Sequence, residues 1–263
     1  MISNNAPFIS VILSIFNGEN FLEKSINSVL EQTYGNFELI IIDDCSNDNT
    51  YNLVLDFAKK DSRVKIIKNN FNMGLTRSLI EAIKVAKGEL IFRQDVDEIS
   101  YSNRFEEQLK LFKNDDVVAV GCNSIDIYYN QLSIYWGYNN EKKIKKIISL
   151  KTIFPHGSSA FNKNAYFKSG GYDASLITCQ DFDLWNKLKN YGRILMTKET
   201  LLKRYIHKES ISHKKKYKQF IDLLKIKIKY NNIGVILILS LIYQLILLSI
   251  PTFIIIKLKT ILE

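Results

Sequence analysis

Residues 37–46 read Phe-Glu-Leu-Ile-Ile-Ile-Asp-Asp-Cys-Ser, a run that is apolar at nearly every position and then stops at two aspartates. Apolar residues at successive rather than alternate positions are typical of a strand buried on both faces, as in a parallel sheet covered by helices. A helical pattern follows over residues 50–60, and another short apolar run follows at 64–67. Strands that alternate with helices in this way predict an α/β fold.

The same alternation continues on both sides of this stretch. We expect strands over 8–15, 37–42, 64–67, 89–93 and 117–122, and helices over 19–32, 50–60, 75–86 and 103–113. The later part is less regular. There we expect a hairpin near Asn130-Gln131, helices over 141–150, 164–169 and 181–190, and strands over 153–161, 194–196 and 201–206. Together these elements predict a mostly parallel, Rossmann-like sheet flanked by helices.

The formal charge of +9 on the 263 residues is unevenly distributed. Residues 203–263 contain 12 basic and 3 acidic side chains, so residues 1–202 are neutral overall. A neutral globular part with acidic clusters would repel a phosphate backbone, which argues against nucleic acid as a partner. The three cysteines are scattered, with neither a pairing pattern nor metal-ligand spacing, and they fit a reducing compartment.

The basic excess lies next to the one long apolar segment. Residues 213–230 combine lysines with apolar side chains at helical spacing, and the 24 residues 233–256 carry no charge. A helix of that length would extend about 36 Å, more than the roughly 30 Å hydrocarbon core of a bilayer. We therefore expect residues 213–263 to form a basic amphipathic helix and a membrane-associated apolar tail, which either spans the bilayer or lies in its plane near Pro251.

The alternative for this tail is a soluble helix packed on the preceding domain or in a dimer interface. The lysines favour an anionic membrane surface and place the preceding domain on the cytoplasmic face of the cell membrane.

Polar residues follow each of the first four expected strands. They are Ser14 and Asn17, then Asp43 and Asp44, then Asn69, Asn70 and Asn72, and finally Asp95 and Asp97. Any one of these groups is better explained as a turn or cap. Four groups along the carboxyl edge of a parallel sheet favour a polar ligand such as a nucleotide, because ligands of open α/β sheets bind at that edge.

Asp95-Val96-Asp97 is the most specific of these groups. Alternate residues of an extended segment point the same way, so the two carboxylates can share one divalent cation, Mn²⁺ or Mg²⁺, with phosphate oxygens as further ligands. The sequence contains no glycine-rich phosphate loop. We therefore expect a metal and basic side chains, with Arg77 and His207 as candidates, to hold the phosphates.

Several motifs share their order and spacing with one enzyme family over residues 6–212. They are residues 8–17, 28–33, 37–46, 72–77, 92–99, 170–173, 180–185 and 205–212. Together they resemble the family-two inverting glycosyltransferases of GT-A fold. Matching motifs in register over most of the chain are far more specific than any one of them.

The resemblance implies roles for the candidate residues. It assigns contacts with the donor nucleotide to Ser14, Asp43, Asp44, Arg77 and Asp95. Asp97 would bind the metal, with His207 at the metal or diphosphate, and Asp181 would be the catalytic base. Without the family, Asp181 also fits the first turn of a helix and His207 a strand residue.

Two positions depart from the pattern of the family. Relatives commonly have Glu where this chain has Gln180 and Asp where it has Glu98. The base position is intact, so we expect activity, with altered acceptor contacts. The Gln-x-x-Arg-Trp motif of processive relatives is absent, which implies one sugar per encounter.

The resemblance divides the chain into a catalytic domain, 1–212, and the tail, 213–263. The nucleotide-binding half covers about 1–122 and the acceptor half about 123–212. The implied activity is inverting, metal-dependent transfer of one sugar, of the hexosyl or N-acetylhexosaminyl type, from a nucleotide-sugar, with UDP as the expected nucleotide. The acceptor would be a saccharide or lipid-linked saccharide in surface polysaccharide biosynthesis.

Two other functions compete with this one. A sugar nucleotidyltransferase would show a glycine-rich basic loop near its amino terminus, and Asn17-Gly18-Glu19 is no such loop. A membrane-bound component that binds a saccharide or partner without turnover would not need Asp97 and Asp181.

Overall fold

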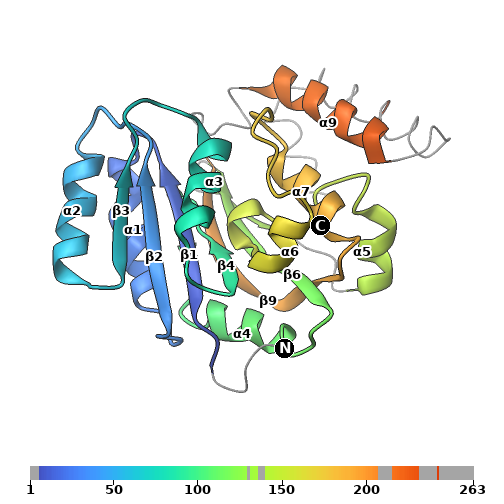
Figure 1. Cartoon of the computed structure of the whole chain (residues 1–263), viewed down its shortest axis with the longest axis horizontal. Coiled ribbons are helices and arrows are strands. Elements are labelled where there is room, and N and C mark those ends of the chain that lie inside the picture. The colour runs from blue at the N-terminus through green and yellow to red at the C-terminus, as the bar shows by residue number, and fades with distance from the viewer. Residues whose placement is uncertain (1–5, 129–130, 136–139, 207–214, 231–241, 243–263) are drawn as a thin grey trace.

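The computed structural model describes residues 6–128, 131–135, 140–206, 215–230 and 242. A mixed sheet of nine strands lies at the centre, with helices on both of its faces (Figure 1). The strands are β1 (Ile9–Ile15), β2 (Phe37–Asp43), β3 (Val64–Lys68), β4 (Leu90–Arg93), β5 (Glu98–Ser100), β6 (Val117–Tyr128), β7 (Gln131–Tyr135), β8 (Ala160–Asn162) and β9 (Arg193–Ile206). The helices are α1 (Glu19–Leu30), α2 (Thr50–Lys60), α3 (Leu75–Val85), α4 (Arg104–Leu111), α5 (Glu141–Ile147), α6 (Lys163–Lys168), α7 (Gln180–Leu188) and α9 (Lys216–Tyr230), with a 3₁₀ turn, η1 (His156–Ser158).

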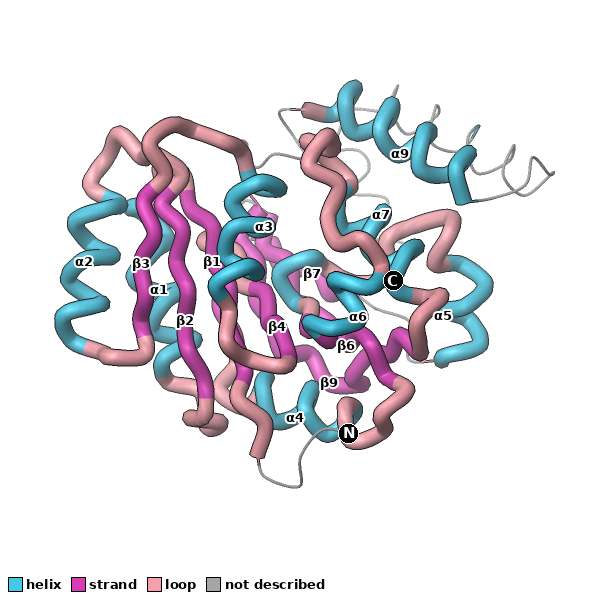
Figure 2. The backbone as a smooth tube through the Cα atoms, in the orientation of Figure 1, coloured by secondary structure: helices cyan, strands magenta, loops and turns pink. Residues whose placement is uncertain are grey.

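The strand order is β3-β2-β1-β4-β8-β6-β9-β5, with β7 paired to β6. Figure 2 shows β3, β2, β1 and β4 in this order. Strands β1 to β4 are parallel to one another, and β6 is parallel to β9. β8 is antiparallel to both β4 and β6, and β5 and β7 are antiparallel to their partners. The α/β fold is confirmed. The expectation of a mostly parallel sheet is right for β1–β4 and for the β6–β9 pair, but the four antiparallel pairs correct it to a mixed sheet.

Alternate residues of the parallel strands enter two separate cores. Val11 and Leu13 pack toward α1, α2 and α4, whereas Ile12 and Ile40 pack toward α3, α5, α6 and α7 on the other face. Because both faces are covered, β2 is buried along its whole length. This explains why its sequence is apolar without alternation.

The expected strand over 153–161 is wrong. Ile153 and Phe154 are fully buried, but Pro155 has no amide hydrogen to donate to a ladder. The chain turns through η1, and only residues 160–162 pair with neighbouring strands.

The expected strands at 194–196 and 201–206 are one strand, β9, and the strand that begins at 117 continues to Tyr128 rather than ending at 122. The polar residues that interrupt both apolar patterns lie where the register of the β6–β9 ladder shifts, so pairing continues on either side of them. Strand β5 was not predicted, because three residues are too few to show a period.

The basic amphipathic helix of the tail is confirmed as α9, which begins at Lys216 rather than at 213. Within the described residues, no helix has both the length and the apolar character needed to cross a bilayer. Of the predicted apolar tail 233–256, all residues but Ile242 lie outside the described part of the chain.

Candidate active site

Asp44 follows β2 directly, and its carboxylate is bonded to the loop that leads from β3 to α3. Its Oδ1 accepts hydrogen bonds from Asn69 Nδ2 at 2.7 Å and from the Met73 amide at 2.8 Å, and its Oδ2 accepts from the Gly74 amide at 2.8 Å. Gly74 has a φ of +84°, which favours glycine. Three charge-assisted bonds thus fix this loop, and a nucleobase contact would use the remaining acceptor capacity of the carboxylate.

Two other residues predicted to contact the donor nucleotide, Ser14 and Asp43, lie at the same edge of the sheet. Ser14 lies on β1 in register with Ile42 and is partly exposed. Asp43 is fully buried, and its Oδ2 has no hydrogen-bond partner among the described residues. A buried acceptor without a partner is available to a ligand. Arg77 is exposed in the first turn of α3, where its guanidinium can reach an anionic ligand.

The acidic loop, residues 94–97 between β4 and β5, carries Asp95 and Asp97. The Asp95 side chain is 27% exposed and forms an ion pair with the fully buried guanidinium of Arg93. Burial alone would raise the pKa of Asp95, but the charges of Arg93 and Arg204 outweigh it and hold that pKa below its ordinary value. The Asp97 carbonyl accepts a hydrogen bond from the Tyr205 amide at 2.9 Å, which ties the acidic loop to the end of β9.

Glu98, the first residue of β5, is buried beside the acidic loop. Burial and the neighbouring charge of Asp95 raise its pKa to about 8. The carboxyl group lies against Gly157, where a Cβ atom would approach Glu98 Oε2 to 1.8 Å. Glu98 therefore supports the acidic loop as a protonated, packed side chain at neutral pH. Gly157, which has no side chain, leaves the space that the Glu98 carboxyl group occupies.

Asp181 lies in the first turn of α7 and is partly exposed. Burial raises its pKa to about 6, although the backbone amides at the beginning of the helix lower it. Asp95 raises the same pKa further, and Arg93 lowers it, so Asp181 lies within electrostatic reach of the acidic loop. A carboxylate with a pKa close to neutrality can both accept and release a proton at physiological pH.

His156 lies close to these groups, in η1. Its Nε2 and the Tyr172 hydroxyl are 2.7 Å apart, and burial together with the charge of Arg93 lowers its pKa to about 3. The imidazole is therefore neutral.

The structure thus brings Asp95, Asp97 and Asp181 into one electrostatic neighbourhood. Ser14, Asp43 and Asp44 lie at the ends of β1 and β2, and Arg77 follows in the first turn of α3, after the loop that Asp44 holds. His207 lies outside the described residues. Within the described part of the chain, no group of three or more His, Cys, Asp or Glu side chains is arranged to hold a metal ion.

Arg93 is a site residue that was not predicted from the sequence. It occupies the last position of β4 and is fully buried, with Nη1 donating to the Ile12 carbonyl at 3.1 Å and Nη2 bonded to Asp95. The sequence did contain one sign of this role, the spacing between Arg93 and Asp95. Arg93 and Asp95 are two positions apart, so they share one side of an extended segment.

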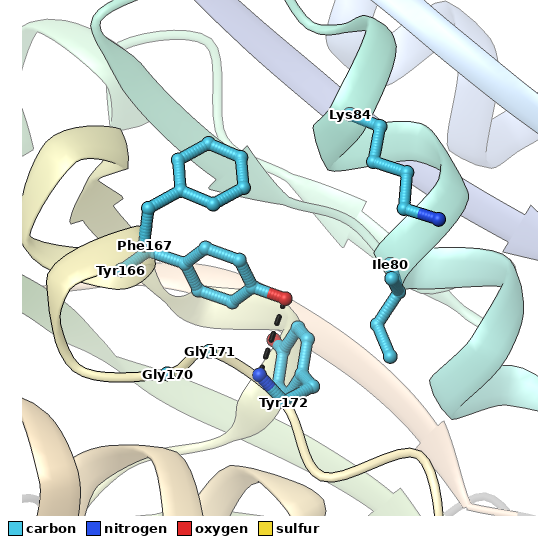
Figure 3. A pocket seen from close by; sticks show the side chains of 7 residues that line it. All are labelled: Ile80, Lys84, Tyr166, Phe167, Gly170, Gly171 and Tyr172. Carbon is cyan, nitrogen blue, oxygen red and sulfur yellow. Dashed lines mark hydrogen bonds between the residues drawn. The ribbon is translucent and has the colours of Figure 1, made fainter.

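A small cavity of about 190 Å³ lies between α3, α6 and the loop after α6 (Figure 3). It is lined by the rings of Tyr166, Phe167 and Tyr172, and the Tyr172 amide donates to the Tyr166 hydroxyl at 3.1 Å. None of the predicted site residues lines it. Tyr172 nevertheless connects it with the site, because its hydroxyl contacts His156.

Comparison with known proteins agrees with this arrangement. The sequence profile of glycosyl transferase family 2 matches residues 10–171, so the chain belongs to that family. It is 33% identical over 200 residues to the putative glycosyltransferase EpsE of Bacillus subtilis (strain 168), covering 72% of this chain and 69% of EpsE. It is 31% identical over 190 residues to the O-antigen biosynthesis glycosyltransferase WbnJ of Escherichia coli, covering 69% of this chain and 72% of WbnJ.

Solved structures share the fold. The mannosyltransferase PcManGT from Pyrobaculum calidifontis, in complex with GDP-Man and Mn²⁺, has a TM-score of 0.68 at 17% identity, covering 93% of this chain and 70% of that one. The chain spans 38% of the length of S. aureus TarS and 71% of TarS 1–349 solved with UDP-GlcNAc. The protein is thus a family-two glycosyltransferase of GT-A fold, rather than a nucleotidyltransferase or a non-catalytic binding component.

Proposed function

We propose that the enzyme transfers one sugar per encounter from a nucleotide-sugar to a saccharide or lipid-linked saccharide, with inversion at the anomeric carbon and with a divalent metal. The observation that carries the proposal is the raised pKa of Asp181 beside the acidic loop. Asp181 is a partly exposed carboxylate with a pKa of about 6, and it interacts electrostatically with Asp95 of the acidic loop.

An acceptor hydroxyl is a weak nucleophile and needs a base at the moment of attack. In the proposed step Asp181 takes the hydroxyl proton, and the acceptor oxygen forms a bond with the anomeric carbon. The bond from that carbon to the diphosphate oxygen breaks, and the nucleoside diphosphate leaves with the electron pair. Attack from the face opposite the leaving group inverts the anomeric centre without an enzyme nucleophile.

The residues present fit a divalent cation. Asp95 and Asp97 are partly exposed carboxylates on one short loop, and oxygen ligands of this kind suit Mn²⁺ or Mg²⁺. A metal held by Asp97, with His207 as the further candidate, would stabilise the negative charge that develops on the diphosphate. The Mn²⁺ in the PcManGT complex supports this proposal.

The nucleotide would bind along the ends of β1 and β2. The free Oδ2 of Asp43 and the partly exposed Ser14 offer polar contacts there, and Arg77 offers a positive charge. We take UDP as the nucleotide to test first. GDP is its competitor, because PcManGT was solved with GDP-Man.

The acceptor class follows from the relatives and from the tail. WbnJ is named for O-antigen biosynthesis, which supports a surface polysaccharide or glycolipid as the product. We also propose that the tail holds the enzyme on the cytoplasmic face of the cell membrane. Tyr217, Ile221 and Ile228 of α9 are 77%, 46% and 52% exposed, and lysines flank them. Such a face suits an anionic lipid surface, where a lipid-linked acceptor would be found.

The experiment is a transfer assay with UDP- and GDP-sugars, Mn²⁺ and a lipid-linked saccharide acceptor, using the full chain. Asp181→Asn and Asp97→Ala should each abolish transfer, and Asp181→Asn should leave nucleotide binding intact. Asp56→Asn, an exposed carboxylate on α2, is the matched control and should transfer normally. Retained turnover in Asp181→Asn would show that Asp181 is not the base. Full activity in the presence of a chelator would show that the reaction needs no metal.

A further inference from the structure

Helix α9 contacts the chain on both sides of Asp181. Figures 1 and 2 show α9 beside α7, and the two helices pack against each other. Just before the base, the Thr178 hydroxyl donates to Asp222 Oδ2 at 2.8 Å, and the Cys179 thiol lies 3.5 Å from the Gln219 carbonyl. Thr178 and Asp222 are 4% and 1% exposed, so water does not compete with this bond.

The second contact lies just after the base. The Tyr230 hydroxyl donates to Asp183 Oδ1 at 2.9 Å, and Lys229 Nζ lies 3.1 Å from the same oxygen. Asp183 is 1% exposed and also pairs with Lys187 of its own helix. Asp181 is therefore bracketed by two buried carboxylates, one on each helix, that are bonded across the interface.

The two ends of α7 are held in different ways. Leu184, Trp185 and Leu188 belong to the main core and anchor the second half of the helix. The first turn begins at Cys179, which has a φ of +57° although it is not glycine. A left-handed non-glycine residue costs free energy and persists only where its surroundings hold it. The contacts with α9 supply that restraint at the turn that carries Asp181.

We propose that α9 is a positioning element for the catalytic base, whose inner face fixes the first turn of α7 through the Thr178–Asp222 and Tyr230–Asp183 hydrogen bonds. This rests on the proposed role of Asp181 as the base. The tail helix would then do two things at once. Its outer face would meet the membrane, and its inner face would set the geometry of proton abstraction.

The test uses conservative variants of the full chain. Thr178→Val and Tyr230→Phe each remove one hydroxyl donor and keep the shape and the charges of the interface. Each should lower kcat by about tenfold with the KM for the nucleotide-sugar within about twofold, because a small displacement of a catalytic group affects the chemical step. Thr178→Ser keeps the hydroxyl and should restore kcat.

Ser10→Ala is the matched control. Ser10 donates a buried hydrogen bond of 2.7 Å to the Glu38 carboxylate, on β1 and β2 and away from α7. The Ser10→Ala variant should lower the melting temperature as much as Thr178→Val does, and it should leave kcat unchanged. An equal loss of kcat in Ser10→Ala would show that general destabilisation causes the effect, and it would overturn the proposal.

The outcomes separate this inference from the proposed function. An inactive Asp181→Asn together with wild-type kcat in Thr178→Val and Tyr230→Phe would overturn the positioning role and keep the base. An active Asp181→Asn would overturn the base itself. Nucleotide binding, measured by calorimetry, checks that each variant is folded. If one of the two variants fails to fold, the other still tests the proposal, because it removes a different hydrogen bond.

Discussion

The fully buried guanidinium of Arg93 donates a hydrogen bond through Nη2 to Oδ1 of Asp95, the first carboxylate of the acidic loop. The same guanidinium is bonded to the Ile12 carbonyl of β1 and the Gln94 carbonyl. Arg93 therefore ties the acidic loop to the centre of the sheet and keeps Asp95 ionised.

Arg93→Met should lower both stability and activity. Loss of the cation removes the attraction that lowers the pKa of Asp95 and leaves its partly exposed carboxylate without a partner. It also leaves the Ile12 and Gln94 carbonyls without their buried donor, so we expect stability to fall and transfer to drop at least about tenfold. Urea unfolding and the transfer assay measure the two effects.

Arg193→Met is the control for this change. Arg193 pairs with Glu141 at 2.8 Å, but its side chain is 35% exposed. Its loss should lower stability far less than Arg93→Met does, because water screens the pair. Equal losses in the two variants would mean that burial does not matter to the Arg93 pair.

The transfer rate should rise with pH through about 6. Asp181 must be deprotonated to act as a base, and burial raises its pKa to about 6. Below that pH the carboxyl group is protonated and the rate falls about tenfold per pH unit. The profile of kcat against pH, at saturating metal and donor, measures this limb. A rate that is constant from pH 5 to 7 would contradict the assignment.

Asp181→Asn should stabilise the fold at neutral pH while it abolishes transfer. The pKa of Asp181 rises from 3.8 to about 6 on folding, so between these values the folded chain binds more protons and stability falls as pH rises. Asparagine carries no charge, so the variant does not lose stability as the pH rises through this range. We expect the variant to gain about 1 to 3 kcal/mol at pH 7 and nothing at pH 3.5, as measured by urea unfolding. A loss of stability at pH 7 would contradict the burial of this charge.

Gly157→Ala should disturb the acidic loop by displacing the Glu98 side chain that packs beside it. A Cβ atom there would lie 1.8 Å from Glu98 Oε2 and 2.5 Å from its Cδ, and Glu98 is only 4% exposed and cannot move into water freely. Overpacking of this kind costs about 1 to 3 kcal/mol, and the shift of Glu98 should lower transfer by about tenfold. Gly35→Ala, where a Cβ would meet nothing within 4 Å, should change neither stability nor activity.

The regular first half of the fold was predictable because its strands are buried on both faces and its helices bury one stripe each. The acidic loop and Asp181 were found through motif order, since no single one of these carboxylates is distinctive by itself. The role of Arg93 was not found, because a cation at the end of an apolar strand gives no sign of whether it is buried or exposed. The turn at Pro155 broke the expected strand through backbone chemistry that an apolar pattern hides.

The interface between α7 and α9 could not have been predicted either. Lysines dominate the sequence of α9, yet its decisive contacts come from Asp222 and Tyr230, which face α7. Amphipathic spacing shows that a helix has an inner face but does not show what that face meets.

The full chain should bind anionic vesicles more tightly than zwitterionic ones, because the lysines of α9 accompany an exposed apolar face. Lys215 and Lys225 are exposed, and changing both to Glu should weaken binding to phosphatidylglycerol vesicles at least tenfold, since each basic residue near such a surface contributes about 1 kcal/mol. Changing exposed Lys24 and Lys60 of α1 and α2 to Glu alters the net charge equally and should leave binding unchanged. Co-sedimentation at two salt concentrations measures this, because an electrostatic contribution weakens as salt rises. Equal binding to both lipids, or equal effects of the two double variants, would show that α9 does not face the membrane.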